Sequence, residues 1–265
     1  MMILVDGVPI YAATGGRPFD PARPAVIFLH GAGMDHTAFG LQSRWFAWHG
    51  WSVLAVDLPG HGRSEGTPIG SIAGLAAWVE RLMAAAGVEK AALVGHSMGA
   101  AIALEAAARL GGRATQLALL GVAAAMPVHP ELMAAAESDP ARAYKMMTGW
   151  SLAHGARTGG NPTPGLWMSG GTLALLAANA RGTLAKDFAA CSAWTTGKAA
   201  AAAVKCPATI IMGALDVMTP PRSALEIAEL IPAARRVTLP ATGHMMMYEA
   251  PDATLDALIA SLGRA

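Results

Sequence analysis

Several residue types and segments are scarce in this 265-residue chain, and each scarcity excludes a class of protein. The two cysteines, Cys191 and Cys206, are too few for a disulfide framework, and no C-x-x-C or H-E-x-x-H pattern indicates a metal site. Glycine, proline or charge interrupts every apolar run before the roughly 20 residues that cross a bilayer. A formal charge of +1 leaves no basic surface for nucleic acid. We therefore expect no metal, no cofactor, no membrane span and no nucleic-acid partner.

What the chain has in quantity is apolar residues, which make up 54% of it, against 14% charged residues. Its length suits one large α/β domain with a substantial core, and the apolar excess favours an apolar cavity or interface. The first residues, Met1 to Gly7, lack the basic segment and the long apolar stretch of a signal peptide. We therefore expect a cytoplasmic protein that acts on a small molecule. The oligomeric state stays open.

Strand and helix patterns alternate along most of the chain. Strands are expected near 2–5, 8–13, 25–29, 52–56, 91–94, 116–121, 208–212 and 236–239. Helices are expected near 38–48, 70–86, 98–110, 220–230 and 252–262. This alternation predicts an α/β fold with a mostly parallel eight-stranded sheet, helices on both faces and an antiparallel first hairpin.

Residues 126–204 break the rhythm, because they are helical in composition and contain no convincing strand. They follow the sixth expected strand, so we expect a helical lid over the carboxyl edge of a core made of 1–125 and 205–265. A proline-glycine segment at 162–165 interrupts it. Candidates for an apolar pocket under this lid are its methionines and tryptophans, with Met245 from the core, although packing between lid and core would use the same residues. They are Met126, Met133, Met146, Met147, Trp150, Trp167, Met168 and Trp194, and Trp167 is expected to form a wall because it follows the segment at 162–165.

The strongest motif is Gly-His-Ser-Met-Gly at 95–99, between an apolar strand and a helix-forming run. A serine on so sharp a turn holds a strained backbone and presents its hydroxyl over the sheet edge, at the N-terminus of a helix. This context predicts that Ser97 is a nucleophile. The alternative use of Ser97 is a simple helix N-cap.

A serine nucleophile needs a base and an acid that orients the base. His244 follows the expected strand 236–239, and Asp216 follows the expected strand 208–212. Asp216 has an alternative use as a cap for the helix that begins near Pro220. The chain order Ser97, Asp216, His244 differs from the orders of chymotrypsin and subtilisin. Because His30 and His61 belong to glycine turns, we expect them to position backbone.

Small residues follow the apolar strand 25–29, where His-Gly-Ala-Gly occupies 30–33. Backbone N–H groups in such a loop approach a substrate oxygen closely, so we expect the amides of Ala32 and Met98 to form an oxyanion hole. Gly33 is the alternative to Ala32. Gly31 and Gly33 are also expected to lie beside the substrate.

These motifs resemble those of the α/β-hydrolase superfamily, in particular its small cap-bearing bacterial esterases, lactonases and C–C hydrolases. The segment Asp-Leu-Pro-Gly-His-Gly-Arg-Ser at 57–64 is similar to a family motif, as is Gly243-His244 followed by Glu249 and Pro251. The resemblance covers about 20–125 and 205–262. It implies a serine hydrolase with a Ser-His-Asp triad.

We therefore expect cleavage of an ester, thioester or lactone of a small-to-medium apolar acyl group through an acyl-enzyme. Three alternatives stay open: C–C bond hydrolysis, cofactor-free perhydrolysis with the same triad, and a ligand receptor without turnover on the same fold. A serine at position 97 excludes relatives that form an alkyl-enzyme ester on aspartate. The acyl length and the natural substrate stay open.

Overall fold

One eight-stranded sheet organises the chain in the computed structural model, which describes residues 1–160, 166–180 and 182–264. The strand order is β1-β2-β4-β3-β5-β6-β7-β8. The first two pairings, β1 with β2 and β2 with β4, are antiparallel, and the remaining five are parallel. The strands are β1 (Met2–Val5), β2 (Val8–Ala13), β3 (Ala25–Leu29), β4 (Ser52–Val56), β5 (Ala91–His96), β6 (Ala114–Leu120), β7 (Ala208–Gly213) and β8 (Arg235–Leu239). The predicted α/β fold class is confirmed.

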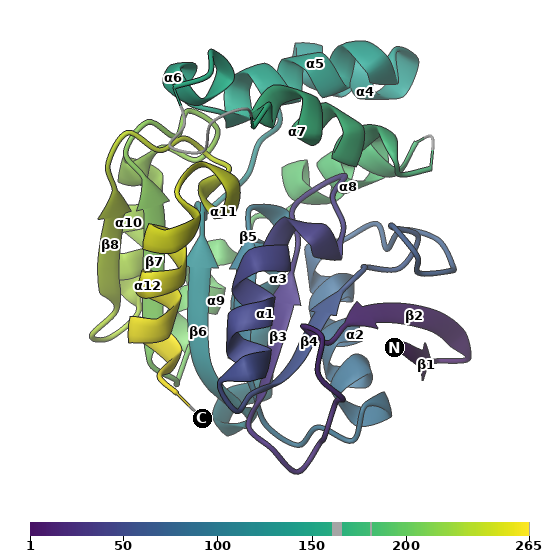
Figure 1. Cartoon of the computed structure of the whole chain (residues 1–265), viewed down its shortest axis with the longest axis vertical. Coiled ribbons are helices and arrows are strands. Elements are labelled where there is room, and N and C mark those ends of the chain that lie inside the picture. The colour runs from purple at the N-terminus through teal and green to yellow at the C-terminus, as the bar shows by residue number, and fades with distance from the viewer. Residues whose placement is uncertain (161–165, 181, 265) are drawn as a thin grey trace.

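Helices cover both faces of the sheet (Figure 1). On one face α1 (Gly40–Trp48) packs against α12 (Pro251–Leu262). On the other face α2 (Ile72–Ala85), α3 (Met98–Leu110), α9 (Gly197–Ala203) and α10 (Pro221–Leu230) form a row of neighbours. Every residue of β3, β4, β5 and β7 is buried, as expected for parallel strands covered on both sides.

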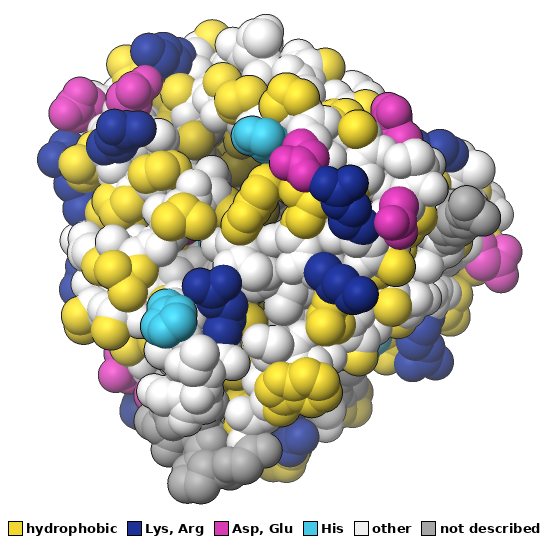
Figure 2. Space-filling model, turned by 90° about the horizontal axis from the view of Figure 1, so that it is seen from above, with side chains coloured by type: hydrophobic (Ala, Val, Ile, Leu, Met, Phe, Trp, Pro, Cys, Tyr) yellow, Lys and Arg dark blue, Asp and Glu magenta, His cyan; other side chains and the backbone are white. Residues whose placement is uncertain are grey.

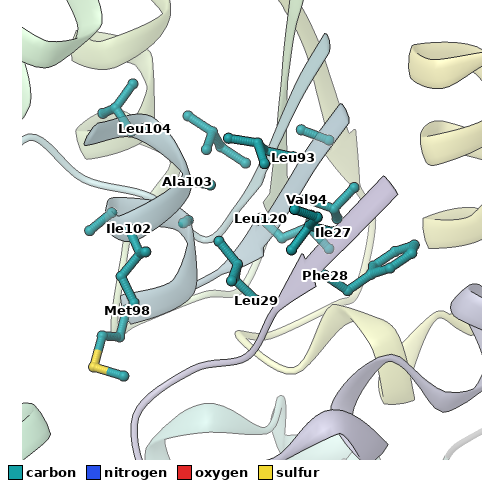
Figure 3. Packing of buried hydrophobic residues seen from close by; sticks show 14 of the residues in the cluster. Ile27, Phe28, Leu29, Leu93, Val94, Met98, Ile102, Ala103, Leu104 and Leu120 are labelled. Carbon is teal, nitrogen blue, oxygen red and sulfur yellow. The ribbon is translucent and has the colours of Figure 1, made fainter. Parts of the chain in front are cut away.

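The core lies between the central strands and these two helical layers. Figure 3 shows Ala103 of α3 beside strand side chains such as Leu93, with Phe28 pointing away from α3. The ring of Phe28 meets Phe46 of α1, with ring centroids 5.9 Å apart. Alternate residues of β3 therefore anchor opposite helical layers, which holds the carboxyl end of this strand in place.

Between β6 and β7 the described residues form five helices that lie above the carboxyl ends of the strands (Figure 1). We call them the covering helices: α4 (Pro130–Ser138), α5 (Pro140–Ser151), α6 (His154–Arg157), α7 (Met168–Ala177) and α8 (Thr183–Ser192). The next helix, α9, packs instead against α3 and α10. The division into a lid at 126–204 and a core stays a prediction. The break predicted at 162–165 lies outside the described residues.

Two short helices stand next to glycine-rich or histidine-bearing loops: the 3₁₀ helix η1 (His36–Phe39) and α11 (Met246–Glu249). The helix expected at 38–48 therefore begins earlier, as η1, because the side chain of Asp35 accepts a hydrogen bond from the Thr37 N–H. A second 3₁₀ turn, η2, spans Gly111–Arg113. None of the described helices has the length and apolar character needed to cross a membrane.

Candidate active site

Ser97 occupies the turn between β5 and α3, with φ 55° and ψ −119°. A side chain at Gly95 would place its Cβ 2.1 Å from the Gly99 oxygen, and one at Gly99 would reach 2.1 Å from the Leu29 oxygen. Only glycine fits at both positions, so the turn stays as sharp as the motif predicts. The Ser97 side chain makes no capping hydrogen bond to α3, which argues against the N-cap alternative.

Asp216 and His244 come from the ends of β7 and β8 and form a buried pair, with 2.7 Å between Oδ2 and Nδ1. The Thr219 hydroxyl donates to the same carboxylate oxygen at 2.7 Å, and its N–H donates to Oδ1 at 2.9 Å. Burial alone would raise the pKa of Asp216, but His244 and the Thr219 donors outweigh it and lower this pKa below its ordinary value. Asp216 therefore orders the turn before α10 and also faces His244. It does not cap α10, whose N-cap is Pro220 without a side-chain hydrogen bond.

The second nitrogen of His244 is left available. Nδ1 lies against a carboxylate with lowered pKa, so Nδ1 carries a hydrogen and donates a hydrogen bond to Asp216. The other nitrogen, Nε2, is buried and has no hydrogen-bond partner among the described residues. Gly121 leaves room for this ring, because a Cβ there would lie 3.0 Å from His244 Cε1. An unpaired basic nitrogen at this place is suited to accept a proton.

His96, in the same strand as the serine turn, has a positioning role. Its Nε2 donates to the backbone oxygen of His244 at 2.9 Å, and the two rings lie 4.7 Å apart. Burial, followed by the nearby His244 ring, lowers the pKa of His96 to about 3. His96 therefore stays neutral and ties the loop of His244 to β5.

The loop that carries His244 is also tied to the covering helices. The N–H of His244 donates to the Ser151 oxygen at 2.7 Å. The carboxylate of Glu249 accepts from the N–H groups of Ala153 at 2.9 Å, Gly243 at 3.1 Å and Met245 at 3.1 Å. Burial raises the pKa of Glu249, although these three donors oppose the increase. The sequence indicates Glu249 only as part of a motif, whereas its hydrogen bonds show that it orders the His244 loop.

The N–H groups predicted for the oxyanion hole differ in whether they already donate a hydrogen bond within the protein. Gly33 N–H donates to Asp187 Oδ2 at 2.8 Å, so Gly33 is not free to bind an oxyanion and this alternative is wrong. The amides of Ala32 and Met98 donate to no other described residue. A Cβ at Gly31 would lie 3.3 Å from Ser97 Cβ, which places this glycine beside the serine. Ala32 and Met98 thus keep the donors that an oxyanion hole requires.

A cavity of about 910 Å³ opens beside Ser97 and Ala32. Of the predicted pocket residues, Met126, Met147 and Trp150 line it. Further walls come from residues that the sequence analysis did not single out, in the covering helices and after β7: Leu132, Phe188, Val217 and Met218. Figure 2 views the molecule from above, on the side of the covering helices. It shows a hollow with apolar walls and with charged and histidine side chains beside it. Lys198, Arg222 and Glu226 line the cavity as well.

The other predicted pocket residues lie elsewhere. Trp167 is 70% exposed and does not line the cavity, because its ring lies over Gly170 on the outside of α7. Met168, Trp194 and Met245 are buried in the core, Met133 and Met146 pack against it half-buried, and none of the five lines the cavity. Gly31 and Gly33 are also absent from its walls. The packing alternative describes the buried members of this set. The expectation that Trp167 forms a pocket wall is wrong, because this side chain is exposed and outside the cavity.

Among the described residues, one cluster has the spacing of a metal site: Asp35, His36 and Asp57. Asp57 Oδ1 already accepts from the N–H and the Nδ1 of His36, at 2.7 and 2.8 Å. Its Oδ2 accepts from the Arg63 N–H at 2.8 Å. These contacts order the loops after β3 and β4, and the cluster lies outside the cavity walls.

Comparison with known proteins gives a consistent picture. Residues 26–257 match the model of the alpha/beta hydrolase family. A dihydrolipoyllysine-residue acetyltransferase component of an acetoin cleaving system, from Cupriavidus necator, is 38% identical over 120 residues, which are 44% of this chain and 30% of that protein. The enol-lactonase of Burkholderia xenovorans LB400 has a TM-score of 0.87 and 23% identity, with 99% of both chains covered. A hydrolase from Pseudomonas aeruginosa PA01 has a TM-score of 0.85 and 25% identity, covering 99% of this chain and 98% of its own.

Replacing Glu249 should loosen the His244 loop. In Glu249→Gln a single amide oxygen remains to accept from three N–H groups, so we expect the free energy of unfolding at pH 7 to fall by about 1–3 kcal/mol. The control is Glu137→Gln, at an exposed position, with an expected change within about 0.5 kcal/mol. Denaturant unfolding of both variants measures the difference, and equal effects would contradict the role of Glu249.

The pH dependence gives a second measurement. The pKa of Glu249 is raised above 4.5, so the folded state binds this proton more tightly than the unfolded state. The wild type should therefore lose stability as the pH rises from about 4.5 through the raised pKa, and Glu249→Gln should lack this component. Parallel stability curves for the two proteins in this window would contradict the assignment.

Proposed function

The chain belongs to the α/β-hydrolase family, and we propose that it is a serine hydrolase that cleaves an ester, thioester or lactone of a small-to-medium apolar acyl group. One observation carries the proposal: the strained turn of Ser97 lines a cavity together with Thr219, and Thr219 contacts a buried Asp216–His244 pair whose Nε2 has no partner among the described residues. In the proposed reaction Ser97 is the nucleophile, His244 the base and Asp216 the orienting acid.

In the first step the Ser97 oxygen attacks the carbonyl carbon, and its proton passes to Nε2 of His244. The ionised Asp216, held by Thr219, stabilises the imidazolium that forms. The Ala32 and Met98 amides bind the negative charge on the carbonyl oxygen. His244 then returns the proton to the leaving alcohol, thiol or enol, and water hydrolyses the acyl-enzyme by the same route.

The walls of the cavity favour an apolar acyl group. Most of its lining residues are apolar, and its volume of about 910 Å³ exceeds what an acetyl group fills. The solved enol-lactonase shares the fold, so lactones belong among the substrates to test. C–C hydrolysis and perhydrolysis would use the same groups, and a receptor would form product only stoichiometrically, far below a typical enzyme rate of about 10 per second.

Removing the proposed nucleophile tests the proposal directly. In Ser97→Ala we expect hydrolysis of p-nitrophenyl esters to fall about a thousandfold or more, since only the oxyanion donors and binding contribute to the residual rate. A fluorophosphonate probe should label the wild type once and the variant not at all. Ser223→Ala is the matched control, because Ser223 lines the same cavity away from the turn, and it should keep labelling and turnover. Full activity in Ser97→Ala would end this proposal.

The cavity predicts a chain-length profile. Each methylene buried against its walls contributes about 0.8 kcal/mol, so kcat/KM should rise up to roughly fourfold per methylene from acetyl esters and then fall once the pocket is full. Trp150→Ala should move the optimum toward longer or bulkier acyl groups, because Trp150 forms part of the wall. Trp167→Ala, at an exposed position outside the cavity, should keep the wild-type profile. A flat profile in the wild type, or equal shifts in both variants, would contradict this assignment.

A further inference from the structure

The loop that carries the proposed oxyanion donor Ala32 is hydrogen-bonded to two side chains of the covering layer, by which we mean the covering helices and the loops between them. Asp187, in α8, accepts the Gly33 N–H through Oδ2 at 2.8 Å. Asn179, between α7 and α8, donates through Nδ2 to the Gly33 oxygen at 2.9 Å and accepts the Gly62 N–H through Oδ1 at 2.8 Å. Both backbone polar groups of Gly33 are therefore satisfied by residues about 150 positions away in the sequence.

The carboxylate of Asp187 is itself fixed by a buried charge. His61 Nδ1 lies 3.0 Å from the Pro59 oxygen, and its Nε2 lies 2.8 Å from Asp187 Oδ2. A carbonyl and a carboxylate only accept hydrogen bonds, so both ring nitrogens must carry protons and His61 is an imidazolium. Burial opposes the charge, but Asp187 outweighs it and raises the pKa of His61. Both side chains are about 2% exposed, which makes this a buried ion pair at the base of the loop.

The peptide unit on the other side of Ala32 is fixed by a neutral histidine. His30 Nδ1 donates to the Gly31 oxygen at 2.8 Å, and its Nε2 accepts the Leu58 N–H at 3.1 Å. Burial and then the neighbouring His61 lower the pKa of His30 to about 3, so it stays neutral. The Gly31 carbonyl and the Ala32 N–H belong to one planar peptide unit, so this bond orients the Ala32 amide directly.

Ala32 is thus held between two fixed peptide planes. The preceding plane is held by His30 of the core, and the following plane, which contains the Gly33 N–H, is held by Asp187 of the covering layer. Gly33 also packs closely under α8, since a Cβ there would lie 2.9 Å from Leu184 Cδ1. The Ala32 donor lies in the preceding plane, and the two planes meet at the Ala32 Cα. A displacement of the Ala32–Gly33 peptide would therefore shift this Cα and the donor attached to it, and an oxyanion donor must lie within about 0.5 Å of its productive position.

We propose that Asp187 and Asn179 are positioning residues that hold the Ala32 amide in place for the oxyanion, so that catalysis depends on the contact of the covering helices with this loop. The inference rests on the proposed serine hydrolase. It assigns the covering layer a part in transition-state stabilisation in addition to forming the pocket walls.

The test measures kcat, KM and the inhibition constant of a short alkylboronic acid, which forms a tetrahedral adduct on serine and so reports the oxyanion hole. Asp187→Ala should lower kcat at least about tenfold and weaken the boronic acid by a similar factor, with KM changed less than about twofold. Asp187→Asn keeps an acceptor for the Gly33 N–H, so it should recover part of both losses. Asn179→Ala should change the same two quantities in the same direction.

The control is another contact between the α8–α9 region and the core. Glu105, in α3, accepts from Trp194 Nε1 at 2.8 Å and from the Thr196 hydroxyl, far from the oxyanion loop. Glu105→Ala removes this acceptor, so it should lower the thermal midpoint without changing kcat or boronic acid affinity. A merely structural Asp187 would behave like this control, and that result would overturn the inference.

Two further outcomes are decisive. A raised KM with unchanged kcat in Asp187→Ala would make Asp187 a substrate-binding residue and would also overturn the inference. If Asp187→Ala does not fold, Asn179→Ala is judged by the same split between kcat and KM and by the same inhibitor. Failure of the proposed function is distinguishable, because the wild type would then neither turn over esters nor bind the boronic acid.

Discussion

The close approach of α3 to β3 and β5 is the constraint on which the rest of the structure depends. With backbone at Gly95 and Gly99 too near its neighbours to admit a Cβ, the first turn of α3 contacts the carboxyl end of β3 directly. Ser97, at the start of α3, and the loop of Ala32, which leaves β3, are therefore brought to one point. The close packing around Gly95 and Gly99 holds Ser97 in its strained backbone conformation, because the surrounding backbone leaves no room for another one.

Around this point the site is shared between the sheet and the covering helices. Ser151, from α5, accepts the His244 N–H, Glu249 ties the same loop to Ala153, and Asp187 holds Gly33. Each contact uses a buried backbone group that would otherwise lack a partner, and leaving such a group unpaired costs about 1–3 kcal/mol. The proposed base and the proposed oxyanion donor are thus each ordered from both layers. This arrangement couples the geometry of the pocket to that of the reacting groups.

The strand order along the chain, the turn at Ser97 and the positions of Asp216 and His244 could be predicted, because apolar runs and glycine turns are local signals. The residues of the covering layer that hydrogen-bond the loops at the sheet edge could not be predicted from the sequence. Asp187 belongs to the same helix as the exposed Lys186 and reads as a solvated charge, yet it is buried. Its spacing from Leu184 and Cys191, three residues before and four after, is the signal that places it on the inward face of α8. Trp150 and Trp167 are equally apolar, and only the packing separates a pocket wall from an exposed ring.

An acyl group on Ser97 is the central claim, and mass spectrometry of the protein during turnover tests it most directly. With an activated p-nitrophenyl ester the leaving group departs fast, so quenched samples should carry one acyl group, mapped to the peptide that contains Ser97 and lost at the rate of steady turnover. Steady turnover with no adduct at any quench time, or an adduct on another residue, would contradict the claim.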